Sequence, residues 1–238
     1  PIFDNVRAEI VDATTFVSVT QRNSIDAWLF ETCSDCLQHV IGLFIRYYGV
    51  VCPIYPRLLS LLVGFVVRGH KDVSTMGVAA LFRLLLEAGK EMDGVMWDES
   101  IEVLGAAVRE TAPNFLALFG EGGRERANTH DSAQKERRNL RSGWGARRLT
   151  ELLCQSDVQV QLVKGLAELS ERMQGVLNER QMLAVLDALN AIQAHAVATN
   201  EDIALRGTIQ ALQQEEEVPP EKRIPDPPLL ELESEVSS

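Results

Sequence analysis

The sequence has little cysteine and an excess of acidic over basic residues, and each feature excludes a class of protein. Its 238 residues include 4 cysteines, whereas small secreted domains held by disulfides are much denser in cysteine. A reducing compartment, the cytosol, is therefore expected. The 23 basic residues stand against 34 acidic ones, a formal net charge of −11. Because phosphate backbones bind basic surfaces, the composition predicts no nucleic-acid partner.

The sequence also lacks a long apolar run and a leader. The longest apolar stretch, 58–67, contains Ser60 and Gly64 and is about half of the ~20 residues that a helix needs to span a bilayer. It predicts a buried helix rather than a membrane span. The sequence starts at Pro1 without an initiator methionine or a signal peptide, so we expect a piece of a longer protein.

Helical periodicity dominates residues 25–212. In the first segment, apolar residues recur at steps of three and four, which predicts one broad apolar helix face. These residues are Trp28, Leu29, Cys33, Cys36, Leu37, Val40, Leu43, Phe44 and Tyr47. Gly49 and Pro53 follow, so the helix should end near Tyr48.

Three further helices are expected before residue 119. Pro56 opens the first of them, which runs to about Val67. The next, 72–88, is apolar over so much of its circumference that both of its flanks must be covered. The third begins near Asp93 or Asp98, whose carboxylates suit a helix N-terminus, and ends around Pro113.

The second half of the chain repeats this pattern after a break. Glycines and charges crowd residues 120–145 and indicate a basic linker. Helices are expected over 147–173, from Asn178, an N-cap, to about 192, and over 200–212. Acidic residues and five prolines fill 215–238, and proline cannot continue a helix, so an extended tail is expected.

The sequence thus predicts an all-α fold of antiparallel helix pairs, a HEAT/armadillo-like α-solenoid. No β segment competes, because short runs such as 17–19 lack a turn-bounded partner. The expected organisation is a helical block over 1–119, the linker over 120–145, a second block over 146–214 and the tail over 215–238.

One run of residues suggests metal or redox chemistry. Cys33, Cys36 and His39 form a C-x-x-C-x-x-H pattern, but on an unbroken helix Cys33 and His39 lie roughly 9 Å apart along the axis. Ligands of one tetrahedral zinc lie within about 4 Å of each other. We therefore expect core packing for these cysteines, and no metal, cofactor or catalytic residue is predicted.

Five arginines form the one basic concentration in this acidic chain: Arg137, Arg138, Arg141, Arg147 and Arg148. A solvated linker is the simpler interpretation. The functional one is contact with anionic lipid or an acidic protein surface, because each basic residue near a charged membrane contributes about 1 kcal/mol.

Several short segments of the sequence, taken in order, resemble those of a known family. In the first half these are Pro1-Ile2-Phe3-Asp4-Asn5-Val6-Arg7, Trp28-Leu29-Phe30-Glu31-Thr32-Cys33, Leu43-Phe44-Ile45-Arg46-Tyr47-Tyr48, Gly77-Val78-Ala79-Ala80-Leu81-Phe82-Arg83-Leu84, Trp97-Asp98-Glu99 and Thr111-Ala112-Pro113. In the second half they are Leu186-Asp187-Ala188-Leu189, Ala194-His195-Ala196, residues 200–206 and Asp226-Pro227-Pro228-Leu229-Leu230-Glu231-Leu232-Glu233. Together they resemble the second and third homology regions downstream of the Sec7 domain in the large, brefeldin-sensitive Arf guanine nucleotide exchange factors, particularly plant-type members.

The resemblance implies a parent protein that acts in vesicle traffic. Its Sec7 domain would carry the exchange activity, and no match to that catalytic motif occurs in this chain. The implied role is regulatory: recruitment, autoinhibition and self-association through contacts with Arf- and Rab-family GTPases or with other domains of the parent. The implied location is the cytosol, peripherally associated with trans-Golgi and endosomal membranes.

Two other functions stay open at this point. An unrelated helical-repeat adaptor that binds peptides or partner helices in a groove would show the same helical spacing. An enzyme is the third alternative, although no nucleophile, base and orienting group can be assembled from the sequence.

Overall fold

The computed structural model describes residues 19–115, 131–215, 217–220 and 223–237, with side chains at 28, 30–115, 148–214, 217–220 and 223–237. Every regular element in these ranges is a helix, which confirms the predicted all-α class. The repeat arrangement of a solenoid stays a prediction. The chain divides into two compact units, Pro1–Arg46 and Tyr47–Ser238, and each is described by itself.

The first unit contains helix α2, Val19–Arg46. Its apolar residues differ in how far their side chains are buried. Leu37, Ile41 and Phe44 are buried, whereas Trp28 and Leu43 are 61% and 58% exposed. The predicted single broad apolar face therefore separates into a narrow buried stripe and an exposed one, a distinction that helical spacing alone does not make.

The second unit begins with three short helical elements. Helix α3 (Tyr48–Val51) and a 3-10 turn (Cys52–Ile54) lead into α4, Tyr55–Val66, with Pro56 in its first turn as predicted. Helix α4 buries five residues: Tyr55, Leu58, Leu59, Leu62 and Val66. By length and composition alone, Tyr48–Val66 and Glu179–Glu201 could each cross a membrane, a property that core helices of soluble proteins share.

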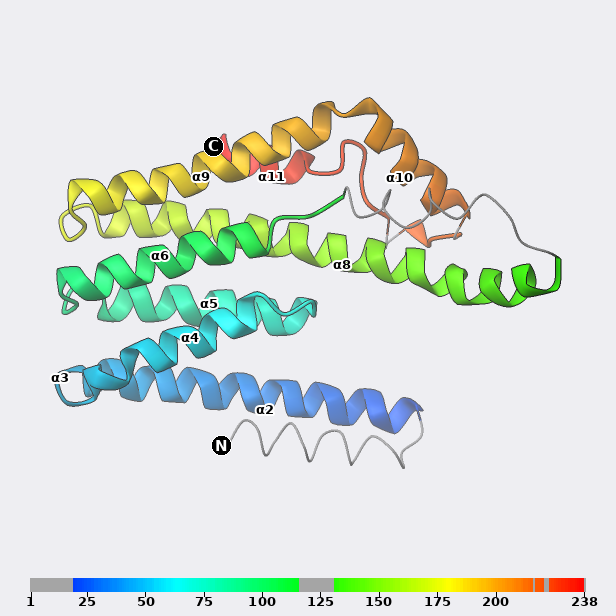
Figure 1. Ribbon diagram of the computed structural model, residues 1–238. Helices are drawn as coiled ribbons and strands as arrows, with labels where there is room; N and C mark the ends of the chain where they lie inside the picture. Colours follow the sequence, from blue (N-terminus) through cyan, green and yellow to red (C-terminus); the bar gives the residue numbers. More distant parts are fainter. Residues whose placement is uncertain (1–18, 116–130, 216, 221–222, 238) are drawn as a thin grey trace. The chain divides into compact units, whose positions relative to one another are not determined.

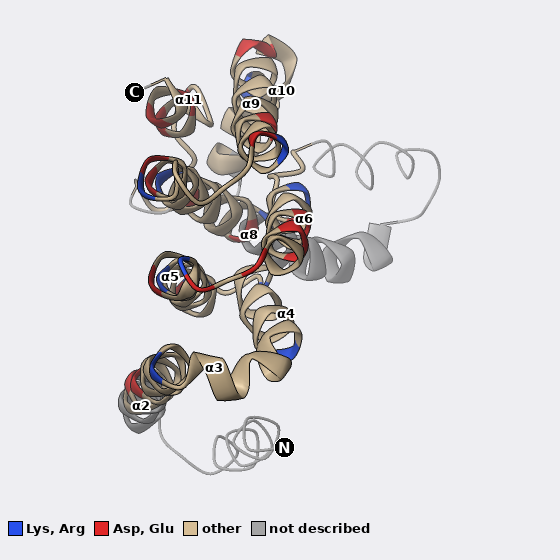
Figure 2. Cartoon of the chain, turned by 90° about the vertical axis from the view of Figure 1, so that its left-hand side faces the viewer, with Lys and Arg blue, Asp and Glu red and all other residues tan. Residues whose placement is uncertain are grey.

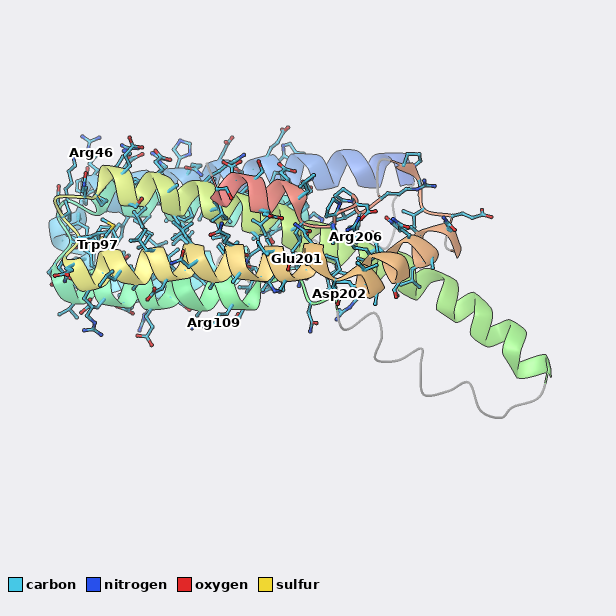
Figure 3. The ribbon with its side chains drawn as sticks, turned by 90° about the horizontal axis from the view of Figure 1, so that it is seen from above. Arg46, Trp97, Arg109, Glu201, Asp202 and Arg206 are labelled. Carbon is cyan, nitrogen blue, oxygen red and sulfur yellow. The ribbon has the colours of Figure 1, made fainter. Side chains whose placement is uncertain are left out.

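Helices α5 and α6 follow their predicted limits. Helix α5, Lys71–Ala88, buries side chains on most of its circumference and packs against both α4 and α8. The predicted cover on both flanks of this helix is confirmed. Helix α6, Gly94–Glu110, is capped by the Asp93 carboxylate, which accepts a hydrogen bond from Met96 N at 2.9 Å. The buried Trp97 donates its indole N–H to Gly89 O at 3.0 Å (Figure 3).

Helix α8 is longer than the sequence predicts. It runs without a break over Asp131–Arg172, so the predicted linker over 120–145 is helical from Asp131 onward. The glycines of this stretch suggest a break, but Gly143 and Gly145 lie inside the helix. A single glycine costs a helix only about 1 kcal/mol, which a long helix with a buried apolar stripe can sustain.

The C-terminal part forms three helices: α9 (Glu179–Glu201), α10 (Ile203–Glu215) and α11 (Leu230–Val236). Asn178 caps α9 as predicted, in a capping box with Gln181. The prediction of an extended tail over 215–238 is wrong for 230–236, because α11 packs against α8 and α9. Prolines precede this helix but none interrupts it.

Within the second unit, the helices form two layers (Figures 1 and 2). Helices α5, α8 and α11 follow one another in one layer, and α4, α6 and α9 in the other. The unit boundary therefore falls between Arg46 and Tyr47 rather than in the predicted linker. The physical reason is that α8 and α9 cover apolar faces of α5 and α6, which joins the two predicted blocks.

Helices α5 and α8, neighbours in one layer, approach closely at Gly165. A Cβ atom added at Gly165 would collide with the ring of Phe82, so the ring rests directly on the glycine. Gly77 plays the same part between α5 and α4, where an added Cβ would meet Phe65 Cβ and Val66 N at 2.8 Å. Two glycines thus set how closely α5 packs on both sides.

We expect Gly165→Ala to destabilise the second unit by about 1–3 kcal/mol, because the added methyl group overpacks the Phe82 contact. Gly64→Ala is the matched control. Gly64 is also helical but has nothing within 4 Å of an added Cβ, so alanine there should stabilise by roughly 0.5–1 kcal/mol. Urea unfolding of both variants measures the difference, and equal effects would contradict the packing argument.

Candidate functional site

Helices α9 and α10 supply side chains that hydrogen-bond the C-terminal segment. We call the contact surface formed by Asn200, Arg206, Gln210 and Gln213 the tail-docking groove. Residues 218–236 are called the tail, and the structure describes 218–220 and 223–236 of them. Glu201, Asp202 and Arg206 mark the bend at which α9 passes into α10 (Figure 3). Residues 200–206 and 226–233, two of the segments that carry the family resemblance, are in contact here although about twenty residues separate them in the sequence.

Asn200 binds the start of helix α11. Its Oδ1 accepts a hydrogen bond from Leu229 N at 2.8 Å, and its Nδ2 donates to Glu233 Oε2 at 2.7 Å. Asn200 is buried, and a buried amide must satisfy both ends. One side chain therefore fixes both the main chain and the first turn of α11.

Gln213 binds the tail in the way a neighbouring strand would. Its Oε1 accepts from Ile224 N at 2.5 Å and its Nε2 donates to Ile224 O at 3.3 Å. Gln213 is 7% exposed and Ile224 is 4% exposed. The amide replaces water for both main-chain groups of Ile224, and this contact depends on backbone position rather than on the identity of residue 224.

Asp226 is bound by charge as well as by hydrogen bonds. Arg206 Nε lies 2.5 Å from Asp226 Oδ1, and Gln210 Nε2 donates to Asp226 Oδ2 at 2.6 Å. The hydrogen bond from Arg206, helped by its positive charge, lowers the pKa of Asp226 below the usual range. Both groups are partly exposed, so the pair fixes register more than it adds stability.

Apolar side chains fill the space between these polar contacts. Val218, Ile224, Leu229 and Leu232 are all buried. Full burial of such a side chain contributes about 1.5–3 kcal/mol, so these anchors supply most of the tail's binding energy while the amides fix its position. At its far end, Glu235 Oε2 lies 3.5 Å from Lys164 Nζ of α8.

Helix α10 ends in a conformation that glycine normally occupies. Glu217 has φ 48°, its N–H bonds Gln214 O at 3.2 Å, and Val218 N bonds Gln213 O at 3.0 Å. This is the hydrogen-bond pattern of a Schellman motif, whose left-handed position favours glycine. A residue with a side chain there costs roughly 1–2 kcal/mol.

Two more buried amides join helices elsewhere in the second unit. Gln159 Nε2 donates to Val108 O at 2.8 Å and Thr111 Oγ1 at 2.6 Å, at the end of α6. Gln181 Nε2 donates to Gly94 O at 3.1 Å and Asp98 Oδ1 at 2.8 Å, at the start of α6. Both ends of α6 are thus bound by glutamines of other helices. Beyond the end of α6, Pro113 O lies 3.1 Å from His195 Nε2 of α9.

Sequence reasoning missed these amides. Only Gln181 carries a signal, because Asn178 followed three residues later by glutamine is a capping-box pattern. In the sequence, Gln159 and Gln213 look like ordinary polar residues on the exposed face of a helix. Their burial becomes visible only in the structure, where other segments cover them.

The structure describes one of the five predicted site arginines in full. Arg148 is half-buried, and its Nη1 bonds Glu151 Oε2 at 2.6 Å. Arg137, Arg138, Arg141 and Arg147 lie on helix α8, and their side chains lie outside the described residues. Their lipid or acidic-partner contact stays a prediction.

The cysteine–histidine run lies on one unbroken helix, as the distance argument assumed. His39 Nδ1 lies 2.7 Å from Asp35 O of its own helix. The prediction of core packing is wrong for Cys36, which is exposed, and Cys33 is half-buried. Among the described residues, no group of three His, Cys, Asp or Glu could hold a metal ion.

These features define an all-helical protein in which buried amides bind the main chain of other segments. The chain is 30% identical over 260 residues to brefeldin A-inhibited guanine nucleotide-exchange protein 2 of Arabidopsis thaliana, covering 99% of the chain and 14% of that protein. It is 28% identical over 247 residues to exchange protein 3 of the same plant, covering 98% of the chain and 13% of the relative. These matches confirm the resemblance: the chain is homologous to one part of these exchange proteins.

The chain spans about one seventh of the length of these relatives. Exchange protein 1 of Arabidopsis thaliana matches as well, at 22% identity over 77% of the chain. No family model matches the chain, and no solved structure does.

We expect Gln213→Ala to loosen the tail, because it leaves the buried N–H and C=O of Ile224 without partners, at about 1–3 kcal/mol for each unsatisfied group. Amide hydrogen exchange at Ile224 should rise tenfold or more, since 1.4 kcal/mol corresponds to a factor of ten. The adjacent Gln214 has an exposed side chain, so Gln214→Ala should change little. Similar exchange rates in both variants would show that Gln213 does not hold the tail.

Proposed function

We propose that this chain is a regulatory, non-catalytic region of a large Arf guanine nucleotide exchange factor that acts in Golgi vesicle traffic. The observation that carries the proposal is the match along nearly the whole chain to a small part of two brefeldin A-inhibited exchange proteins. In this proposal the helix pairs are HEAT-like repeats of the second and third homology regions downstream of the Sec7 domain.

The use of polar side chains supports a scaffold role. Gln159, Gln181, Asn200 and Gln213 are buried, and each bonds a main-chain or side-chain group of another segment. Networks of this kind rigidify an arrangement of helices. A rigid arrangement presents fixed surfaces to partner proteins, which is what recruitment, autoinhibition and self-association require.

The proposed partners are Arf- and Rab-family GTPases, other domains of the parent protein and a second copy of the chain. The proposed location is the cytosol, peripherally associated with trans-Golgi and endosomal membranes. The second candidate function, a helical adaptor that binds peptides, is favoured by one observation: the tail-docking groove binds an extended segment through its main chain at Ile224 and Leu229.

Two measurements test the main proposal. The purified chain should leave the rate of GDP release from Arf unchanged, and intrinsic exchange activity would overturn the non-catalytic role. In pull-downs it should retain GTP-loaded Arf or Rab proteins over their GDP-loaded forms, or retain other regions of an exchange factor. Binding to none of these would overturn the regulatory role and favour the peptide adaptor.

The basic segment of α8 has its own test. Reversal of charge at Arg137, Arg138, Arg141, Arg147 and Arg148 should weaken binding to liposomes that contain phosphatidylserine by at least tenfold, because each cation near such a surface contributes about 1 kcal/mol. Neutral liposomes serve as the control. Unchanged sedimentation with anionic liposomes would exclude lipid contact by these arginines.

A further inference from the structure

The contacts that hold the tail do not require it to come from the same chain. Gln213 binds main chain at Ile224, Asn200 binds main chain at Leu229, and Arg206 binds the Asp226 carboxylate. Each contact would form equally well with residues 218–236 of another copy. The chain passes from the groove to the tail through a turn at Glu217.

That turn is the strained point of the connection. Glu217 adopts a left-handed φ of 48°, a conformation that disfavours any residue with a side chain. The reversal lets Val218 fold back onto Gln213, with Val218 N bonded to Gln213 O at 3.0 Å. If the turn opened, Glu217 could adopt an ordinary extended conformation and the tail would leave its own groove.

We propose that the tail-docking groove also accepts the tail of a second copy, so that two chains exchange residues 218–236 and form a dimer. This inference rests on the self-association included in the proposed function and gives it a route. Exchange of an identical element conserves every contact of the monomer and is a low-cost way to form a dimer. Short hinge turns under strain favour it.

The occupant is a second copy because the groove matches several features of this tail at once. It binds a carboxylate at residue 226 between Arg206 and Gln210. It buries leucines three and six residues later, at 229 and 232, and Lys164 lies near an acidic group at residue 235. A segment from another copy reproduces this whole pattern without any adjustment.

The test compares two substitutions at the hinge. Glu217→Pro fixes φ near −65° and removes the N–H that bonds Gln214 O, so the turn cannot form; this variant should be mostly dimeric. Glu217→Gly relieves the strain of the turn and should be monomeric. Light scattering after size-exclusion chromatography distinguishes the 26.4 kDa monomer from a particle of twice that mass, across a range of protein concentrations.

A second substitution shows whether the dimer is held by exchanged tails. Adding Gln213→Ala to Glu217→Pro should raise the dissociation constant of the dimer at least tenfold, because the substitution removes both hydrogen bonds to the Ile224 main chain, whereas adding Gln214→Ala should not change it. In the Glu217→Pro dimer the Ile224 amide should stay protected from hydrogen exchange, because a groove still binds it. A dimer whose dissociation constant is the same with and without Gln213→Ala is held by another surface and overturns the inference.

If circular dichroism shows that Glu217→Pro is unfolded, the unmodified chain decides the question. Its dimer fraction should rise with concentration and exceed that of Glu217→Gly; a chain that is monomeric at every concentration overturns the inference. Binding of GTPases or of other exchange-factor regions by a strictly monomeric chain would leave the proposed function standing while tail exchange fails.

Discussion

The second unit depends on the contact between the Phe82 ring and Gly165. This contact lets α5 and α8 approach closely, and through α8 it joins the helices that precede residue 116 to those that follow residue 130. Any side chain at residue 165 would separate the two helices and expose the apolar residues between them. Because interiors pack at the density of organic crystals, such a gap cannot be absorbed locally.

Buried amides give this apolar arrangement its register. Gln159 and Gln181 bind opposite ends of α6 to α8 and α9, and Asn200 and Gln213 bind the tail. Apolar burial supplies more energy but tolerates small shifts, whereas a buried amide left without its partner costs about 1–3 kcal/mol. Several positions of a helix would bury similar apolar area, and the hydrogen bonds therefore select one of these positions.

The tail-docking groove is where the sequence resemblance and the structure coincide. Residues 200–206 and 226–233 both resemble segments of the large Arf exchange factors. The structure brings Asn200 and Arg206 into contact with Leu229, Asp226 and Glu233. In a chain that is homologous to one part of much longer exchange proteins, this groove is a place where one segment recognises another through main chain and charge.

Local sequence predicts the helical class, the approximate limits of α4, α5 and α6 and the cap at Asn178, because these depend on local periodicity and on side chains a few residues away. It also carried the relationship to the exchange proteins. Three features became visible in the folded chain alone: α8 continues through the glycine-containing stretch, Cys36 and Leu43 are exposed, and the tail is docked and partly helical. The docked tail depends on the distant helices α8 and α9 that cover α11, and burial by a distant partner leaves no mark on local spacing.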